Sequence, residues 1–305
     1  MKLGSIFQRS LGIKRKDNVL IITDNKKMKI AKKFKRALKG IADNISIVKI
    51  KVDKINTYDA MKPIMKIMLE SDVIIAVTTH SITHSDARIA ASKKGARIAS
   101  MPGFTESMMK ALQADPYEML RVSKRIERVL RKTDMVRVMT PSGTYISFSI
   151  KNRKIEEGSG IIKTKGAYDN LPGGEISLSP VEGTANGLMV INSMGTYAKN
   201  GTLVHVKDGR AFDISDKKCL LAKIFNTVKS SANIAEFAIG LNKKAKIIGN
   251  ILQDEKVYGT CHIAFGNNKS YGGKVFSKVH MDAILFKPTI WFDEKMIMKK
   301  GKLLL

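Results

Sequence analysis

The first part of the chain alternates between short apolar runs and segments with helical spacing, and this alternation most constrains the fold. The runs NVLIITD, ISIVKIKV and SDVIIAVTT start at residues 18, 45 and 71, and polar residues bound them. Between the first two runs, Ile30, Phe34 and Leu38 recur four residues apart, as on one face of a helix. Strands that alternate with helices predict an open parallel sheet with helices on its faces.

The rest of this region continues the same pattern. The segment TYDAMKPIMKIMLE looks helical, but Pro63 predicts that the helix begins or kinks there. ARIAASKKGARIASMPG predicts a helix, then a strand, then a turn at Pro102-Gly103, and a longer helical region follows over residues 106–132. No glycine-rich phosphate signature follows any of these strands, which counts against nucleotide binding.

The pattern changes after Thr133. DMVRVMTPSGTYISFSI alternates with period two on both sides of a Pro-Ser-Gly turn at residues 141–143, which predicts a β-hairpin. Strands, glycines and turns then dominate to the end of the sequence. We therefore expect a Rossmann-like α/β domain with an open parallel sheet over residues 1–133. A β-rich α+β domain should follow over residues 134–305.

The charge of the chain is strongly positive. It has 54 lysines and arginines against 27 acidic residues, a formal net charge of +27. Clustered cations can bind nucleic acid or an anionic membrane surface, whereas lysines on solvated helix faces need no partner. Aromatic residues make up only 6%, and no basic stretch carries interleaved aromatic side chains that could stack on bases. The composition favours solvated helix faces over a nucleic-acid partner.

The sequence also bears on the compartment. No apolar run approaches the roughly 18–20 residues that a membrane-spanning helix needs. The basic amino-terminal segment has neither the apolar region nor the cleavage site of a signal peptide. The two cysteines, Cys219 and Cys261, make no disulfide framework. We expect a protein of the reducing cytoplasm without a membrane partner.

Two of the five histidines, His262 and His280, lie in one short stretch near the end of the chain. If SKVHMDAILF is a strand, His280 and Asp282 are two residues apart and point to the same face. His262, in the strand-like run GTCHIAFG, could reach that face across the sheet. Two histidines and one carboxylate form the minimal set for a divalent transition metal. The alternative is an ordinary hydrogen bond between a histidine and an aspartate on one strand.

Two glutamates add to this metal-binding hypothesis. Glu175 follows a Pro-Gly-Gly turn in NLPGGEISLSP, and Glu236 is flanked by apolar residues in NIAEFAIGL. A carboxylate in an apolar run is costly to bury unless it is paired, hydrogen-bonded or bound to metal. The alternatives are a turn-exit residue for Glu175 and an edge-strand residue that faces water for Glu236.

Several blocks resemble a known family. NLPGGEISLSPVEGTANG, NIAEFAIGLN, DEKVYGTCHIAFGNN and VHMD resemble, in this order, blocks of the aminopeptidase T/aminopeptidase S metallopeptidases, many of them labelled leucyl aminopeptidases. SITHSDARIAASKKGARIASMPG looks like another shared block, so the resemblance covers roughly residues 71–305. It implies a dinuclear metal centre held by five residues: Glu175, Glu236, His262, His280 and Asp282.

The resemblance also implies a function. Two divalent ions (zinc, cobalt or manganese) about 3.5–4 Å apart would activate a water that attacks a peptide near its free amino terminus. Glu175 or Glu236 would take the proton of that water. The family also uses a tyrosine a few residues after the first histidine, where this chain has Lys269 and, two places later, Tyr271. We expect a metal-dependent aminopeptidase with Tyr271 in this role, assembled as a homo-oligomer, most simply a dimer.

The same fold resemblance has a second branch, the mononuclear non-haem Fe(II) enzyme 2,5-dihydroxypyridine dioxygenase. It needs only two histidines and one aspartate, a need that His262, His280 and Asp282 would meet. Retention of both glutamates favours the hydrolase. A third alternative is a non-enzymatic basic protein that binds nucleic acid. His84 lies in the first shared block and is either a substrate-side residue or a loop or helix-cap residue.

Overall fold

The structure of the protein is a computed structural model, and it describes residues 2–51, 59–82 and 85–305. Contacts within the chain divide it into two compact units. Unit 1 comprises Met1–Pro116 and Gly160–Gly173, and unit 2 comprises Tyr117–Ser159 and Gly174–Leu305. This division differs from the predicted boundary at residues 133 and 134, because residues 117–133 make their contacts within unit 2 and residues 160–173 make theirs within unit 1.

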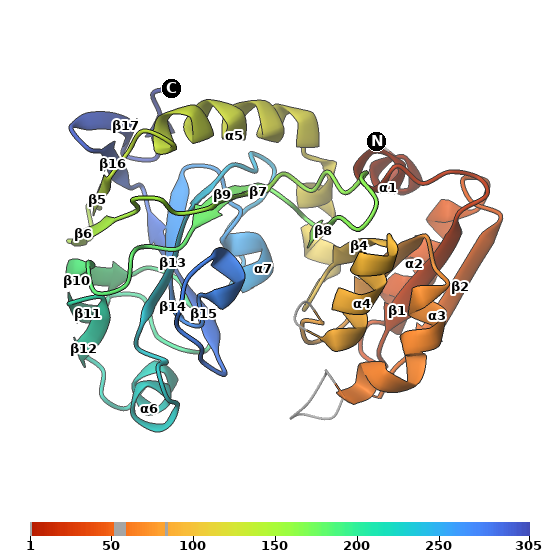
Figure 1. The fold of residues 1–305 in the computed structure, drawn as a ribbon, viewed down its shortest axis with the longest axis horizontal. Helices are drawn as coiled ribbons and strands as arrows, with labels where there is room; N and C mark the ends of the chain where they lie inside the picture. Colours follow the sequence, from red (N-terminus) through yellow and green to blue (C-terminus); the bar gives the residue numbers. More distant parts are fainter. Residues whose placement is uncertain (1, 52–58, 83–84) are drawn as a thin grey trace. The chain divides into compact units, whose positions relative to one another are not determined.

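Unit 1 is built on one five-stranded parallel sheet with the strand order β2-β1-β3-β4-β8. Its strands are β1 (Asn18–Thr23), β2 (Asn44–Lys49), β3 (Val73–Val77), β4 (Arg97–Ser100) and β8 (Tyr168–Asn170). β3 is buried along its whole length, as expected for a parallel strand covered on both faces. The predicted open parallel sheet is confirmed. Figure 1 shows its last strand, β8, in green beside neighbours coloured red to yellow, because the chain adds β8 much later.

The helices of unit 1 are α1 (Leu3–Leu11), α2 (Met28–Leu38), α3 (Met65–Leu69) and α4 (Asp86–Lys94), with the 3-10 helices η1 (Asp59–Ile64) and η2 (Glu106–Gln113). Ile30, Phe34 and Leu38 of α2 are buried, as their spacing predicts. The ring of Phe34 packs edge-on against Phe7 of α1, with 4.8 Å between ring centroids. This apolar face therefore belongs to the core of unit 1.

Prolines set where the predicted helices start and stop. η1 contains Pro63, and α3 begins two residues later, so the predicted interruption is confirmed. The single helical region predicted for residues 106–132 is not continuous. Its first part is the 3-10 helix η2, and α5 (Pro116–Leu130) begins with a proline. A proline fits the first turn of a helix, because the N–H that it lacks would have no partner there.

Unit 2 contains two antiparallel sheets. The eight-stranded sheet, in the order β12-β11-β10-β6-β5-β16-β17-β18, comprises β5 (Met135–Met139), β6 (Tyr145–Ser149), β10 (Asn186–Ile191), β11 (Thr202–Lys207), β12 (Arg210–Ile214), β16 (Thr289–Phe292), β17 (Lys295–Lys299) and β18 (Lys302–Leu303). The five-stranded sheet, in the order β15-β14-β13-β9-β7, comprises β7 (Ile155–Gly158), β9 (Glu175–Leu178), β13 (Ile234–Gly240), β14 (Thr260–Gly266) and β15 (His280–Phe286). Besides α5, its helices are α6 (Leu220–Thr227), α7 (Ile251–Asp254) and η3 (Lys269–Tyr271).

The β-rich character predicted for the second half is confirmed. β5 and β6 form the predicted hairpin, in which Met139 pairs with Tyr145 across the turn. The two sheets share a core, where Phe148 of β6 meets Phe237 of β13 with 5.3 Å between ring centroids. Since neighbouring residues on a strand point to opposite faces, Glu236 points to the other face of the five-stranded sheet.

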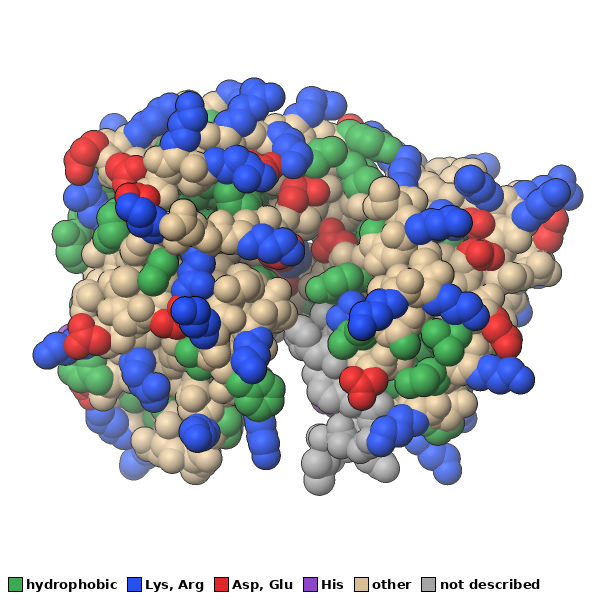
Figure 2. Space-filling view, viewed as in Figure 1, with side chains coloured by type: hydrophobic (Ala, Val, Ile, Leu, Met, Phe, Trp, Pro, Cys, Tyr) green, Lys and Arg blue, Asp and Glu red, His purple; other side chains and the backbone are tan. Residues whose placement is uncertain are grey.

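Basic side chains lie mainly on the surface. On the face shown in Figure 2, lysines and arginines occur over both units, and many lie along α5, where Arg121, Lys124, Arg125 and Arg128 are exposed. Among the described residues, the buried cations are Arg88 and Arg97, each 8% exposed, and Lys256, which is 1% exposed. Lys256 is thus more deeply buried than any other lysine or arginine in the described part of the chain. No helix among the described residues is long and apolar enough to cross a membrane.

Candidate metal centre

The five-stranded sheet of unit 2 brings the predicted metal-binding residues to one face. Glu236 on β13 lies opposite Ala264 on β14, which lies opposite Asp282 on β15. Directly opposed residues of antiparallel strands point to the same face. His262 shares this face because it is two residues from Ala264, and His280 because it is two residues from Asp282. Strand register therefore gathers four titratable side chains from three adjacent strands.

Glu175 reaches the same face from the start of β9, where it lies opposite Gly240. Its side chain is 16% exposed, whereas that of Glu236 is only 2% exposed. β13 is an interior strand with β9 and β14 on its two sides, so Glu236 is not an edge residue facing water. The strand register shifts between Ile234 and Glu236, an irregularity that often re-aims a side chain beside a functional site.

His280 makes polar contacts through both ring nitrogens. Nδ1 lies 2.8 Å from the carbonyl oxygen of Asn267, while Nε2 lies 2.9 Å from Oε2 of Glu236 and 3.3 Å from Oδ1 of Asp282. Burial lowers the pKa of His280, but Asp282 and Glu236 outweigh burial and raise it well above its usual value. If the Nδ1 proton is donated to Asn267, Nε2 is the nitrogen left to bind an ion.

His262 is 1% exposed, and its imidazole approaches three carboxylates at distances that are long for hydrogen bonds. Its Nε2 lies 3.8 Å from Oε2 of Glu175, 3.9 Å from Oε1 of Glu236 and 3.9 Å from Oδ1 of Asp282. These separations exceed hydrogen-bond length. Within the described residues, neither Nδ1 of His262 nor Oε2 of Glu175 has a hydrogen-bond partner. Two donors bonded to one ion at about 2.1 Å lie roughly 3–4.2 Å apart, so this spacing suits donors that share a cation.

The charges in this cluster depend on one another. Burial lowers the pKa of His262, but Glu236 and Asp282 outweigh it and raise that pKa to about 9. Burial raises the pKa of Glu236 and of Asp282, but the two imidazoles outweigh it and lower both values. In the metal-free protein, protons on the histidines thus balance the carboxylates. A divalent cation with mixed nitrogen and oxygen ligands would replace those protons, so the donor set fits a metal.

Two more ionisable residues, Glu255 and Lys256, belong to this cluster, and neither was predicted from the sequence. Donor atoms of Glu255, His262 and Asp282 all lie within 4.8 Å of one another. Nζ of Lys256 lies 2.7 Å from Oε1 of Glu255 and forms a second ion pair with Oε1 of Glu175. The motif Asp-Glu-Lys is typical of an exposed turn. The available signal was its position inside the block DEKVYGTCHIAFGNN, just ahead of His262.

Tyr271 is brought to the cluster by the loop between β14 and β15. Its ring stacks on the imidazole of His280, with 5.0 Å between centroids and 19° between planes. Burial, followed by the charge of Glu236, raises the pKa of the phenol, which therefore stays protonated. Lys269 instead places its ammonium 5.8 Å from the ring of Phe276. Of the two residues weighed at this position, Tyr271 lies at the cluster, and its catalytic role stays a prediction.

This loop is anchored by the residues around Asn268, which is fully buried. The amide nitrogen of Asn268 donates to Oγ of Ser179 at 3.0 Å and to Oε1 of Glu182 at 2.9 Å. Glu182 also pairs with Arg153. Burial raises the pKa of Glu182, but its hydrogen bonds outweigh burial and lower it to about 2. The anchor fixes the loop that presents Tyr271.

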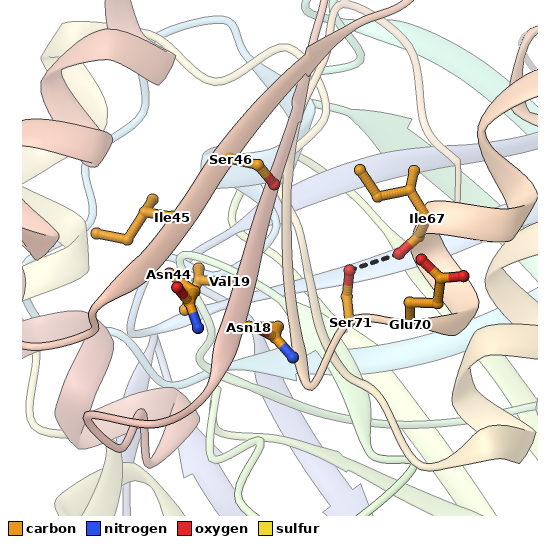
Figure 3. Close-up of a pocket in the computed structure, with 8 residues that line it drawn as sticks. All are labelled: Asn18, Val19, Asn44, Ile45, Ser46, Ile67, Glu70 and Ser71. Carbon is orange, nitrogen blue, oxygen red and sulfur yellow. Dashed lines mark hydrogen bonds between the residues drawn. The ribbon is translucent and has the colours of Figure 1, made fainter.

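A pocket in unit 1 lies away from the ends of the strands where ligands of such sheets bind. Figure 3 shows a pocket of about 540 Å³ in unit 1, lined by residues that include Asn18, Asn44 and Glu70. It lies at the amino-terminal ends of β1 and β2, whereas open parallel sheets bind ligands at the carboxyl ends of their strands. His84, weighed above as a substrate-side residue, lies outside the described residues.

Known proteins are similar to this chain along almost its whole length. The model of the 2,5-dihydroxypyridine 5,6-dioxygenase family (NicX) matches residues 7–305. A 2,5-dihydroxypyridine dioxygenase structure from Pseudomonas putida KT2440 has a TM-score of 0.81 at 17% identity, covering 99% of this chain and 96% of that one. Wild-type AmpT from Thermus thermophilus has a TM-score of 0.72 at 15% identity, covering 100% of this chain and 98% of that one. A comparison with curated proteins finds no match.

These findings confirm the predicted fold and correct the predicted function. At 17% and 15% identity, the two solved structures are evidence for the fold alone. The predicted resemblance to aminopeptidase T is correct at the level of the fold. The predicted activity, a metallo-aminopeptidase and hence a hydrolase and protease, is wrong, because the matching family model is that of a dioxygenase. The hydrolase was favoured because Glu175 and Glu236 are both present, and a cluster so rich in carboxylates was taken to require two metal ions.

Proposed function

Because the chain belongs to the 2,5-dihydroxypyridine 5,6-dioxygenase family, we propose that it is a mononuclear Fe(II) dioxygenase that opens a hydroxylated nitrogen-containing aromatic ring. One structural observation carries the proposal. Two histidines and one aspartate, His262, His280 and Asp282, converge on one face of one sheet, with Oδ1 of Asp282 3.9 Å and 3.3 Å from the two Nε2 atoms. Two histidines and one carboxylate are the ligand set typical of non-haem Fe(II) oxygenases.

The proposed reaction needs no external reductant. The ring bond between carbons 5 and 6 breaks, both atoms of dioxygen enter the same product, and the electrons that reduce dioxygen come from the ring. Bound Fe(II) would supply the redox chemistry that joins dioxygen to the ring. His262, His280 and Asp282 would hold the ion and leave part of its coordination sphere open for substrates.

The surrounding residues would orient the ligands and balance charge. The carbonyl of Asn267 fixes the orientation of His280 through Nδ1, and the ring of Tyr271 packs against the same imidazole. The two histidines lower the pKa of Glu236, which would keep its negative charge beside a bound ion. Such partners of ligands raise metal affinity and hold ligand geometry.

The proposal is tested by oxygen uptake. Protein loaded with Fe(II) without air should consume dioxygen and 2,5-dihydroxypyridine in equal amounts, and the zinc-loaded protein should consume neither. Unhydroxylated pyridine serves as the substrate control. Absence of oxygen uptake by protein that holds one Fe(II) per chain, across a set of hydroxylated pyridines, would contradict the proposal.

A further inference from the structure

Lys256 lies beside the metal centre as a fully buried cation. It is 1% exposed, and its ammonium contacts one carboxylate oxygen each of Glu175 and Glu255. Lysine is almost never buried to this extent unless it is paired. Burial lowers the pKa of Lys256, but Glu175 and Glu255 outweigh burial and raise it, so the group stays charged.

The fold holds this lysine in place from its backbone. The N–H of Lys256 donates to the carbonyl of Gln253 at 3.0 Å, and its carbonyl accepts from the N–H of Asn242 at 2.8 Å. Gly240 on β13 permits this approach, because a Cβ there would lie 2.1 Å from the carbonyl oxygen of Val257. The position of the ammonium is thus built into the packing of β13 against the turn after α7.

The donors around Lys256 resemble one half of a two-metal site. In the described part of the chain, two groups of side chains that could hold a metal ion share Asp282, one with Glu236 and His280, the other with Glu255 and His262. In the second group, however, Glu255 is paired with Lys256. Glu175 contacts the same ammonium through Oε1. Its second oxygen, Oε2, lies 3.8 Å from Nε2 of His262.

We propose that the ammonium of Lys256 takes the place of a second metal ion between Glu175 and Glu255, and so limits this centre to one divalent ion. The inference rests on the proposed mononuclear function and adds a reason why only one metal ion binds. The four carboxyl groups of Glu175, Glu236, Glu255 and Asp282 carry at most four negative charges, and one divalent ion together with one ammonium supplies three positive charges. A second divalent ion would face a buried positive charge at short range, where charges interact strongly.

The test is the number of metal ions per chain, measured with Mn²⁺ by equilibrium dialysis and elemental analysis of the folded protein. The wild type should bind one Mn²⁺ per chain, and Lys256→Ala should bind two. Lys243→Ala is the matched control, since Lys243 pairs with Glu118 on the surface and should leave the count at one. The double variant Lys256→Ala/Glu255→Ala should return the count to one, because it removes a donor of the second ion.

Two results would overturn the inference. One is a folded Lys256→Ala protein that still binds a single Mn²⁺ per chain. The other is a wild type that takes up two ions per chain at high Mn²⁺ with Lys256 in place, a measurement that stands even if Lys256→Ala does not fold. Both readouts are independent of oxygen uptake. A wild type with one ion but no ring-opening activity would therefore count against the proposed function and leave this inference standing.

Discussion

Nε2 of His280 lies 3.3 Å from Oδ1 of Asp282, and a single methionine separates the two residues on β15. Their closeness follows from strand geometry, since side chains two residues apart on a strand point to the same face. The same nitrogen lies 2.9 Å from Oε2 of Glu236 on β13, two strands away. The pair on β15 thus meets a carboxylate that strand pairing brings from β13, and the candidate metal centre is built from both.

Removing one ligand should abolish tight metal binding. His262→Ala should weaken Mn²⁺ binding by more than about 100-fold, because even the loss of a residue that only orients a ligand costs roughly 10–100-fold. Isothermal titration of chelator-treated protein measures the affinity. His205→Ala, an exposed histidine on β11, is the matched control and should bind as the wild type does. Wild-type affinity in His262→Ala would remove this residue from the ligand set.

The metal-free protein should become less stable as the pH rises. The pKa of His262 is raised from 6.5 to about 9 in the folded protein. The stability that its charged form adds is complete below about pH 6.5 and is lost as the pH rises through about 9, roughly 3 kcal/mol in all. Urea unfolding of chelator-treated protein across this range measures the loss. His262→Gln should lose less stability over the same range, and an equal loss in both proteins would contradict the assignment.

Tyr271 should support His280 through its ring. Stacked aromatic pairs contribute about 0.5–1.5 kcal/mol, so Tyr271→Ala should weaken metal binding about two- to tenfold. Tyr271→Phe keeps the ring over His280 and should retain wild-type metal affinity. Any further loss of oxygen uptake in Tyr271→Phe would then report on the hydroxyl alone. Equal metal affinity in the alanine and phenylalanine variants would show that stacking plays no part.

The anchor of the β14–β15 loop should matter for stability. Asn268→Ala leaves buried partners at Ser179 and Glu182 without their donor, which costs about 1–3 kcal/mol of unfolding free energy. Urea unfolding measures this change. Asn44→Ala, at an exposed position that starts β2, should change the unfolding free energy by no more than about 0.5 kcal/mol. Equal effects of the two substitutions would mean that Asn268 is no anchor.

Much of this centre was accessible from sequence, because strand periodicity is local. The spacing of His280 and Asp282 predicts a shared face, and the apolar neighbours of Glu236 predict that its charge is buried against partners. Both expectations agree with the structure. The strand-like run around His262 indicated only that this residue could reach the same face, and its grouping with Glu175 was expected from the family resemblance, because register between distant strands is not encoded in any short segment.

Other features could not be predicted from the sequence and became clear only from the structure and the comparisons. The block DEKVYGTCHIAFGNN places Lys256 near His262 in the sequence, but no local pattern shows that a lysine is buried between two carboxylates, and this became clear only from its ion pairs with Glu175 and Glu255. The helix over residues 106–132 was overestimated because helical spacing continues across Pro116 although the backbone does not. The activity was misassigned because the blocks around His262 and His280 identify a fold and a donor set, and one donor set can serve hydrolysis or oxygen chemistry.

The most direct measurement is the fate of isotopically labelled oxygen in the product of 2,5-dihydroxypyridine turnover. With ¹⁸O₂ in ordinary water, mass spectrometry should find two labelled oxygen atoms in one ring-opened product of the Fe(II)-loaded enzyme. His262→Ala should form no such product. A product that takes its new oxygen from water rather than from ¹⁸O₂ would contradict the dioxygenase assignment and point to hydrolysis at this centre.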